Sequence, residues 1–121
     1  MNPETKLQRR IMVALSNAGH TVFRNETGQF WTGKVIHKDG GTVTLANAHM
    51  IPVGLCVGSS DLIGIQAGTG RFFGIDVKTP TGRVSKEQNQ FIKHVIERGG
   101  IAGVARSIED ALELLSLPTV E

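Results

Sequence analysis

The stretch from Gly58 to Thr79 constrains the fold more than any other part of the chain. It reads GSSDLIGIQAGTGRFFGIDVKT, which is two short apolar runs separated by a glycine-rich segment that favours a turn. Side chains of a strand alternate between its two faces, so Asp76 and Lys78 should share one face while the apolar residues beside them face a core. If the two runs pair as a hairpin, Asp61 at the start of the first lies near Asp76 at the end of the second. The stretch predicts two carboxylates and one ammonium at one edge of a sheet.

Such a constellation suits a hard divalent cation. Two carboxylates in a partly dry site repel each other unless a cation lies between them. Oxygen ligands with open positions fit Mg²⁺ or Mn²⁺, which can activate a water and neutralise charge on a phosphate. Asp-x-Lys is also common on exposed hairpins, where such an ion pair contributes well under ~1 kcal/mol. The tripeptide alone leaves both interpretations open.

Three sequence blocks together resemble one nuclease family. An Asp, a short hairpin and then Asp-x-Lys resembles the PD-(D/E)xK signature. GSSDLIG, FFGIDVKTPTGRVSKEQNQFI and GGIAGVARSIEDAL resemble its VRR-NUC branch in the small stand-alone form of bacteria and phages. The resemblance runs from about Glu4 to Leu115. In two places the chain departs from the family pattern, because Asp76 stands where Glu is usual and Ser60 where Pro is usual.

The resemblance implies both a fold and an activity. The implied fold is α/β, a restriction-endonuclease-like core with a mixed β-sheet flanked by helices. The implied activity is divalent-metal-dependent hydrolysis of phosphodiester bonds in DNA, with Mg²⁺ or Mn²⁺ and no organic cofactor. Stand-alone members resemble junction resolvases, so we expect a homodimer acting on branched DNA such as four-way (Holliday) junctions. Two alternatives are a non-catalytic DNA-binding module and a nuclease subunit that acts on linear or single-stranded DNA within a larger complex.

The resemblance also implies roles for individual residues at or beside the predicted sheet edge. The implied metal ligands are Asp61, Asp76, the Val77 carbonyl and Glu4, which would support the ion or its waters. The residues implied to orient water are Lys78 and Gln88. The expected DNA contacts are Arg24, Asn25, Arg83 and Lys86.

Some of these residues have ordinary structural roles that the sequence alone cannot exclude. Glu4 follows Asn2-Pro3, a helix-start signal, so its charge can simply favour the helix dipole. Gln88 lies three residues after Ser85, which is the spacing of a capping box. Glu26 is either a further acid near the site or a solvated turn residue.

The remaining patterns predict the other elements. An apolar stripe predicts a first helix that ends at Gly19, and strands are expected at 20–24 and 101–105. Strands at 30–37 and 42–45 should flank a turn at 38–41, forming an extension at about 29–46. This extension is either a flap that contacts DNA or a second copy, with Trp31 as an anchor, or a β-structure capped by its own aromatics. Helices should span 85–98 and begin at Ser107, and Pro118 should end the fold.

Composition sets broader limits. A chain of 121 residues fits one domain, with a core at about 4–115. A net charge of +2 is too small to indicate a nucleic-acid partner. The single Cys56 excludes an internal disulfide, and four scattered histidines lack the spacing of a zinc site. With neither a leader peptide nor a long apolar run, we expect no membrane association and a cytoplasmic location, in a bacterium or in the host of a phage.

Overall fold

The computed structural model describes residues 1–116, which form three helices and six strands. In chain order the elements are α1 (Pro3–Asn17), β1 (Thr21–Arg24), β2 (Gly28–Asp39), β3 (Thr42–Val53), β4 (Leu62–Ile65), β5 (Phe72–Val77), α2 (Lys86–Glu97), β6 (Ile101–Ala105) and α3 (Ile108–Leu114). Pro118, expected to end the fold, lies outside the described residues. No helix within residues 1–116 combines the length and the apolar character needed to span a membrane.

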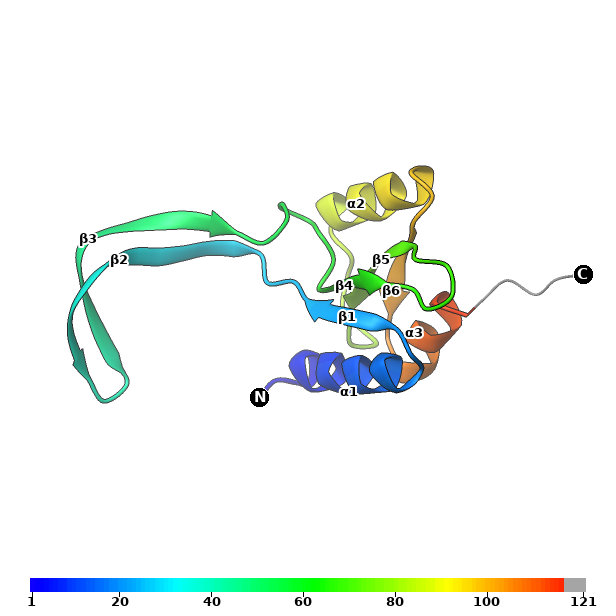
Figure 1. Cartoon of the computed structure of the whole chain (residues 1–121), viewed down its shortest axis with the longest axis horizontal. Coiled ribbons are helices and arrows are strands. Elements are labelled where there is room, and N and C mark those ends of the chain that lie inside the picture. Colours follow the sequence, from blue (N-terminus) through cyan, green and yellow to red (C-terminus); the bar gives the residue numbers. More distant parts are fainter. Residues whose placement is uncertain (117–121) are drawn as a thin grey trace, which may run out of the picture.

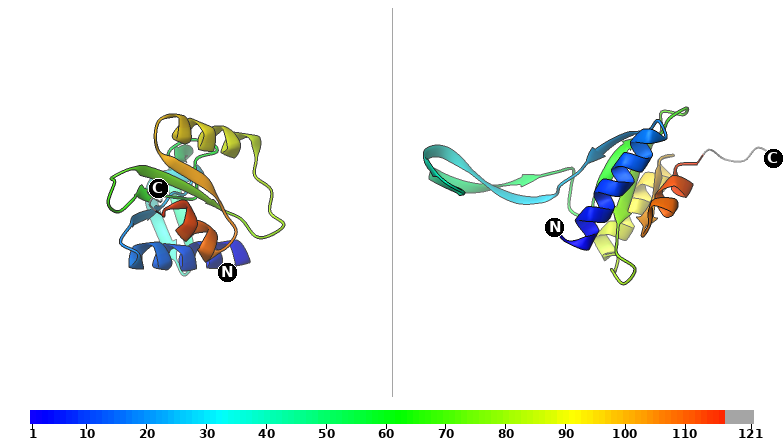
Figure 2. Two further views of the ribbon diagram at one scale, coloured as in Figure 1. Left: turned by 90° about the vertical axis from the view of Figure 1, so that its right-hand side faces the viewer. Right: turned by 90° about the horizontal axis from the view of Figure 1, so that it is seen from below.

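Four of the strands form a mixed sheet in the order β1-β4-β5-β6. The first three pair antiparallel, whereas β6 lies parallel to β5 and is reached through α2. Helices α1 and α3 cover one face of this sheet and α2 lies on the other (Figures 1 and 2). The predicted α/β architecture, a mixed sheet flanked by helices, is confirmed.

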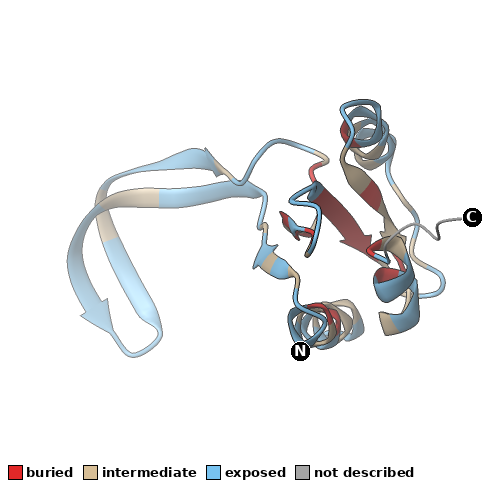
Figure 3. Cartoon of the chain, turned by 45° about the vertical axis from the view of Figure 1, so that its right-hand side comes forward, coloured by how far each residue is buried: buried red, intermediate tan, exposed pale blue. Residues whose placement is uncertain are grey.

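The hydrophobic core lies between the sheet and the α1–α3 pair (Figure 3). Alternation along β5 places Phe73, Ile75 and Val77 on this side, all with no exposed surface. They pack against the apolar stripes of the two helices, whose buried members are Ile11, Leu15, Ala111 and Leu115. Burial of one large apolar side chain contributes about 1.5–3 kcal/mol, so this layer fixes how β5 sits. The polar face of β5 is therefore turned toward α2.

The helix starts follow the local sequence signals. The Asn2 side chain accepts a hydrogen bond from the backbone N–H of Thr5 at 2.7 Å. Ser85 and Gln88 form the predicted capping box, and Ser107 caps α3. Each cap satisfies backbone donors that the first helical turn leaves without a partner.

Strand β6, predicted at 101–105, lies at the edge of the sheet, and its buried residues are Ala102 and Ala105. Helices α2 and α3 pack on it from both sides. Strand order depends on contacts between distant segments, and a run of apolar residues does not encode it.

Strands β2 and β3 form a separate two-stranded ribbon that projects from the core between β1 and β4 (Figure 1). This ribbon, the arm, is longer than the predicted pair of strands and contains register shifts near Gly33 and Ile36. Its aromatic side chains do not cap it, because 45% of Phe30 and 64% of Trp31 are exposed. No residue of β2 or β3 is buried, and most are exposed (Figure 3).

Candidate active site

Pairing of β4 with β5 brings the two predicted carboxylates together. Leu62 lies opposite Ile75, so Asp61, one residue before Leu62, lies opposite Asp76. The Oδ2 atom of Asp61 accepts a hydrogen bond from the backbone N–H of Val77 at 2.9 Å. The hairpin geometry expected from the sequence is thus present at the end of β5.

Asp76 is fully buried on the α2 side of the sheet. Its Oδ1 atom accepts a hydrogen bond from the Gln88 side-chain amide at 3.3 Å. Its Oδ2 atom is also buried, and no group within residues 1–116 hydrogen-bonds to it. A buried carboxylate oxygen without a partner is costly, so Asp76 is not part of an ordinary exposed ion pair. Residues 1–116 also contain no salt bridge between Asp76 and Lys78.

Burial and mutual repulsion perturb both carboxyl groups. Loss of solvent, followed by the charge of Asp61, raises the pKa of Asp76 from 3.8 to about 6. Loss of solvent also raises the pKa of Asp61, against the opposing effects of the Val77 N–H and the charges of Lys78 and Arg24. A cation placed between the two carboxylates would relieve this cost.

A network of side chains holds the loop that carries Asp61. The Asn25 side-chain amide donates to Ser59 Oγ and to the Ser60 carbonyl, each at 2.8 Å. Its backbone N–H donates to the Asp61 carbonyl at 2.8 Å. Asn25 was predicted from the sequence to contact DNA. In the structure its hydrogen bonds position the loop before Asp61. The DNA contact stays a prediction.

Two glycines allow the loop to approach closely. Gly58 has a φ of +84°, and a Cβ there would lie 2.6 Å from the Glu87 backbone. A Cβ on Gly74 would lie 2.6 Å from the hydroxyl of Ser60, which is buried above it. These contacts fix Asp61 between the first turn of α2 and strand β5.

Gln88 forms the predicted helix cap and also contacts Asp76, while its role in orienting water stays a prediction. Its Oε1 atom accepts a hydrogen bond from the Ser85 N–H at 2.9 Å, which completes the cap of α2. Its amide nitrogen donates to Asp76, as described above. The helix cap therefore fixes the side chain that orients the Asp76 carboxylate.

Arg106 supports the segment after Lys78, a role that the sequence analysis missed. Its Nη1 atom donates to the carbonyls of Thr79 at 2.6 Å and Gly82 at 2.8 Å. Lys78, which is half-buried, is held by its own N–H bond to the Ala105 carbonyl at 3.1 Å. One sequence signal could have indicated this role. Arg106 directly follows the strand at 101–105, which was expected to lie parallel to the strand that ends near Lys78.

The other predicted residues are not gathered at the carboxylate pair. No three His, Cys, Asp or Glu side chains within residues 1–116 form a group that could hold a metal, so Glu4 is not in place as a third acidic ligand and its role stays a prediction. Arg24 forms an exposed salt bridge with Glu26 at 3.2 Å. Arg83 and Lys86 are exposed at the start of α2, and their contact with DNA also stays a prediction.

The donor set nevertheless fits a hard divalent cation. Two facing carboxylates supply oxygen ligands, and the unpartnered Oδ2 of Asp76 is a buried acceptor that lacks a positive partner. Neither sulfur nor imidazole lies in this pair, which disfavours softer transition metals.

A comparison with family models agrees with this geometry. The model of the VRR-NUC domain matches residues 46–109, more than half of the chain. The chain belongs to the VRR-NUC family. It is therefore a nuclease domain of the PD-(D/E)xK-like fold, with DNA as the substrate class. The match contains Asp61, Asp76, Lys78 and Gln88, whereas Glu4, Arg24 and Asn25 precede it. A search of curated proteins finds no match to this VRR-NUC chain.

Proposed function

We propose that this VRR-NUC protein is a metal-dependent DNA endonuclease whose ion is held by Asp61, Asp76 and the Val77 carbonyl. The supporting observation is the buried Asp76 Oδ2 atom, which makes no hydrogen bond within residues 1–116 and lies in a carboxyl group that faces Asp61. When bound, Mg²⁺ or Mn²⁺ would neutralise the carboxylates, lower the pKa of a bound water and stabilise charge developing on the phosphate.

The chain's own residues then divide the work around the phosphate. Lys78 follows Asp76 by two residues, just beyond the end of β5, and its charge acts on both carboxyl groups. Its proposed role is to orient the attacking water or to stabilise the transition state. Gln88 holds Asp76 through Oδ1 and thereby leaves Oδ2 for the ion. Arg83 and Lys86 beside this opening would contact phosphates of the bound DNA.

A cleavage assay tests this function. The purified protein is incubated with four-way, flap, duplex and single-stranded DNA in Mg²⁺, in Mn²⁺ and in EDTA. We expect cleavage only with a divalent ion, and loss of at least about a hundredfold in rate for Asp76→Ala and for Lys78→Ala with DNA binding retained. Binding without cleavage in every metal would instead indicate a DNA-binding module that has lost turnover.

We further propose a homodimer that acts on branched DNA, with the arm as the contact between copies. The arm exposes apolar side chains along its whole length, including Phe30, Trp31, Val35, Ile36, Val43, Met50 and Ile51. An isolated two-stranded ribbon is at best marginally stable, so this surface calls for a partner. Two-fold symmetry would place two sites on the two strands of a junction. A stable monomer by light scattering at micromolar concentration would contradict this arrangement.

A further inference from the structure

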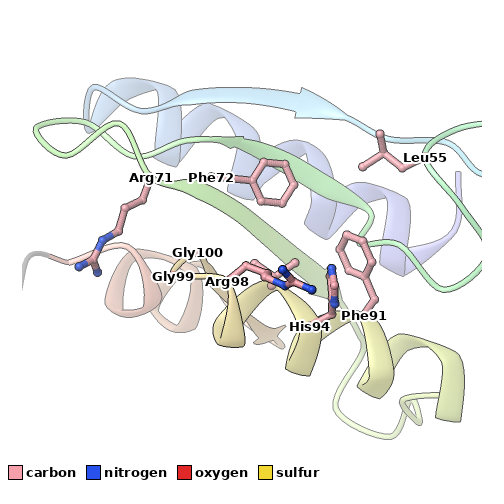
Figure 4. A pocket seen from close by; sticks show the side chains of 9 residues that line it. Leu55, Arg71, Phe72, Phe91, His94, Arg98, Gly99 and Gly100 are labelled. Carbon is pink, nitrogen blue, oxygen red and sulfur yellow. The ribbon is translucent and has the colours of Figure 1, made fainter.

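A hollow of about 480 Å³ lies at the end of α2 and β5 away from the carboxylate pair. Phe91, His94 and Arg98 line it from α2, and Phe72 and Leu55 lie across from them (Figure 4). Phe72 is 40% exposed and Leu55 53%, although both are large and apolar. The hollow is therefore an open apolar surface beside the core.

The hollow and the carboxylate pair lie on the same face of β5, on either side of the point where Phe91 packs on Gly74. Phe72, Gly74 and Asp76 share the α2 face of β5. Along the same line α2 places Gln88 on Asp76 and Phe91 over Gly74, where a Cβ would lie 3.4 Å from the Phe91 ring. Four residues of a strand span ~13 Å, so the Cα atoms of Phe72 and Asp76 lie about that far apart.

The charges around the hollow are of one sign. Arg71, His94 and Arg98 are exposed on its rim, and its lining contains no acidic residue. Within residues 1–116 none of these three side chains forms a salt bridge. Two aromatic rings beside two unpaired arginines provide a stacking surface together with a positive rim, the combination that binds single-stranded nucleic acid.

We propose that this hollow binds an unpaired nucleotide of the DNA strand whose phosphate lies at Asp76. The base stacks on Phe72 and Phe91, and Arg98 and Arg71 contact the flanking phosphates. At the ~3.4 Å rise of a stacked strand, the bound base would lie about four nucleotides or fewer from the cleaved bond. The inference rests on the proposed cleavage at the carboxylate edge, and it predicts that DNA with unpaired bases beside the duplex, such as a flap, is preferred to continuous duplex.

A protein occupant is disfavoured by charge. The best candidate within the chain would be the arm of a second copy, but its charged residues are Lys34, Lys38 and Asp39, which carry a net positive charge. Placing that arm against Arg71 and Arg98 would bring like charges together. A DNA strand supplies both the apolar base and the negative phosphates.

The experiment uses the full chain in EDTA, so that binding is measured without cleavage. Flap DNA carries the fluorescent base 2-aminopurine at one of the first four unpaired positions from the branch. We expect quenching of the probe on binding, and at least about fivefold weaker binding with lost quenching for Phe72→Ala. Phe72→Leu, which keeps apolar bulk without a ring, guards against misfolding and should also lose the quenching.

The arginine is tested with a matched control. Arg98→Ala should weaken binding severalfold and reduce its salt dependence, and Arg98→Lys should restore part of the affinity. Lys93→Ala removes another cation of α2, one that is 79% exposed and paired with Glu97 outside the hollow, and should change neither quantity.

The outcomes separate the two proposals. Asp76→Asn should retain quenching while it abolishes cleavage. If the unaltered protein quenches the probe in EDTA but cleaves no substrate with Mg²⁺ or Mn²⁺, the nuclease site alone is refuted. An unquenched probe at all four positions would overturn the nucleotide site. A Phe72→Leu variant that keeps the quenching would also overturn the nucleotide site. If Phe72→Leu instead makes the protein monomeric by light scattering, the hollow is a protein contact and the nucleotide site is overturned.

Discussion

At the residue scale, the decisive feature is the asymmetry of Asp76. One of its carboxylate oxygens is held by Gln88 and the other is buried without a partner among residues 1–116. Such an arrangement lowers the stability of the metal-free protein, because burial penalises the negative charge of the carboxylate. It also raises the affinity for a cation, because a bound cation relieves that penalty. A bound cation would therefore stabilise this site more than the site's own contacts do.

Replacing Asp76 with Asn separates stability from activity. The substitution keeps the acceptor for Gln88 and removes the buried charge, so we expect unfolding in urea at pH 7.5 to require about 1–2 kcal/mol more in the absence of metal. Cleavage should fall at least about a hundredfold. Glu97→Gln on exposed α2 surface is the control and should change neither. A destabilised Asp76→Asn protein would mean that the carboxylate is already satisfied in the metal-free state.

The pKa of Asp76 also predicts how stability depends on pH. The carboxyl has a pKa of about 6 in the folded protein against 3.8 in an unfolded chain, so between these values the folded state binds more protons. Stability of the metal-free protein should therefore fall as pH rises from about 4 to 6, and Asp61 contributes in the same direction. Mg²⁺ or Mn²⁺ should raise the melting temperature clearly at pH 7.5 and little at pH 5. Equal metal-induced shifts at both pH values would contradict this linkage.

At the element scale, the sequence predicted the features that depend on neighbouring residues, namely strand faces, the hairpin turn and the helix caps. Alternation along β5 separated the core residues from Asp76 and Lys78, and the turn at 67–70 fixed the hairpin that brings Asp61 opposite. The helix caps at Asn2, Ser85 and Ser107 satisfy donors within four residues, so they could be read directly.

The supports of the site could not be predicted in this way. Asn25 reaches Ser59 across 34 residues and Arg106 reaches Thr79 across 27, through contacts that exist only once the sheet has formed. The edge position of β6 has the same origin. The second strand of the arm was predicted to end at Leu45, whereas β3 continues to Val53 through Asn47, which has a left-handed conformation, and Pro52.

Asn25→Ala tests whether this residue positions the loop or contacts DNA. Loss of two part-buried side-chain hydrogen bonds should lower the free energy of unfolding by about 1–3 kcal/mol and reduce cleavage through displacement of Asp61. DNA affinity in EDTA should be unchanged. Asn89→Ala, an exposed position on α2, serves as the control. An unfolding free energy equal to that of the unaltered protein, together with weaker DNA binding, would favour the direct contact.

At the scale of the whole molecule, the protein consists of a small core and an arm that packs chiefly on itself. The core carries both the carboxylate pair and the hollow, whereas the arm carries a series of exposed large apolar side chains. On the proposed function, catalysis and assembly would lie in separate parts of one short chain, which makes them separable by experiment.

Excision of the arm is the direct test of this division. Gly28 and Val53 lie opposite each other, so residues 29–52 can be replaced by an Asn-Gly turn without moving β1 or the loop before Asp61. We expect the core to fold with nearly the same melting temperature, because the arm contributes little to its packing. The excised protein should be monomeric by light scattering, and it should nick flap DNA but lose the paired cuts that resolve a four-way junction. Trp31→Ser with Ile36→Ser, which keeps the ribbon but removes apolar surface, should weaken the dimer in the same direction. A dimer that survives excision would place the interface on the core and leave the arm's apolar surface to another partner.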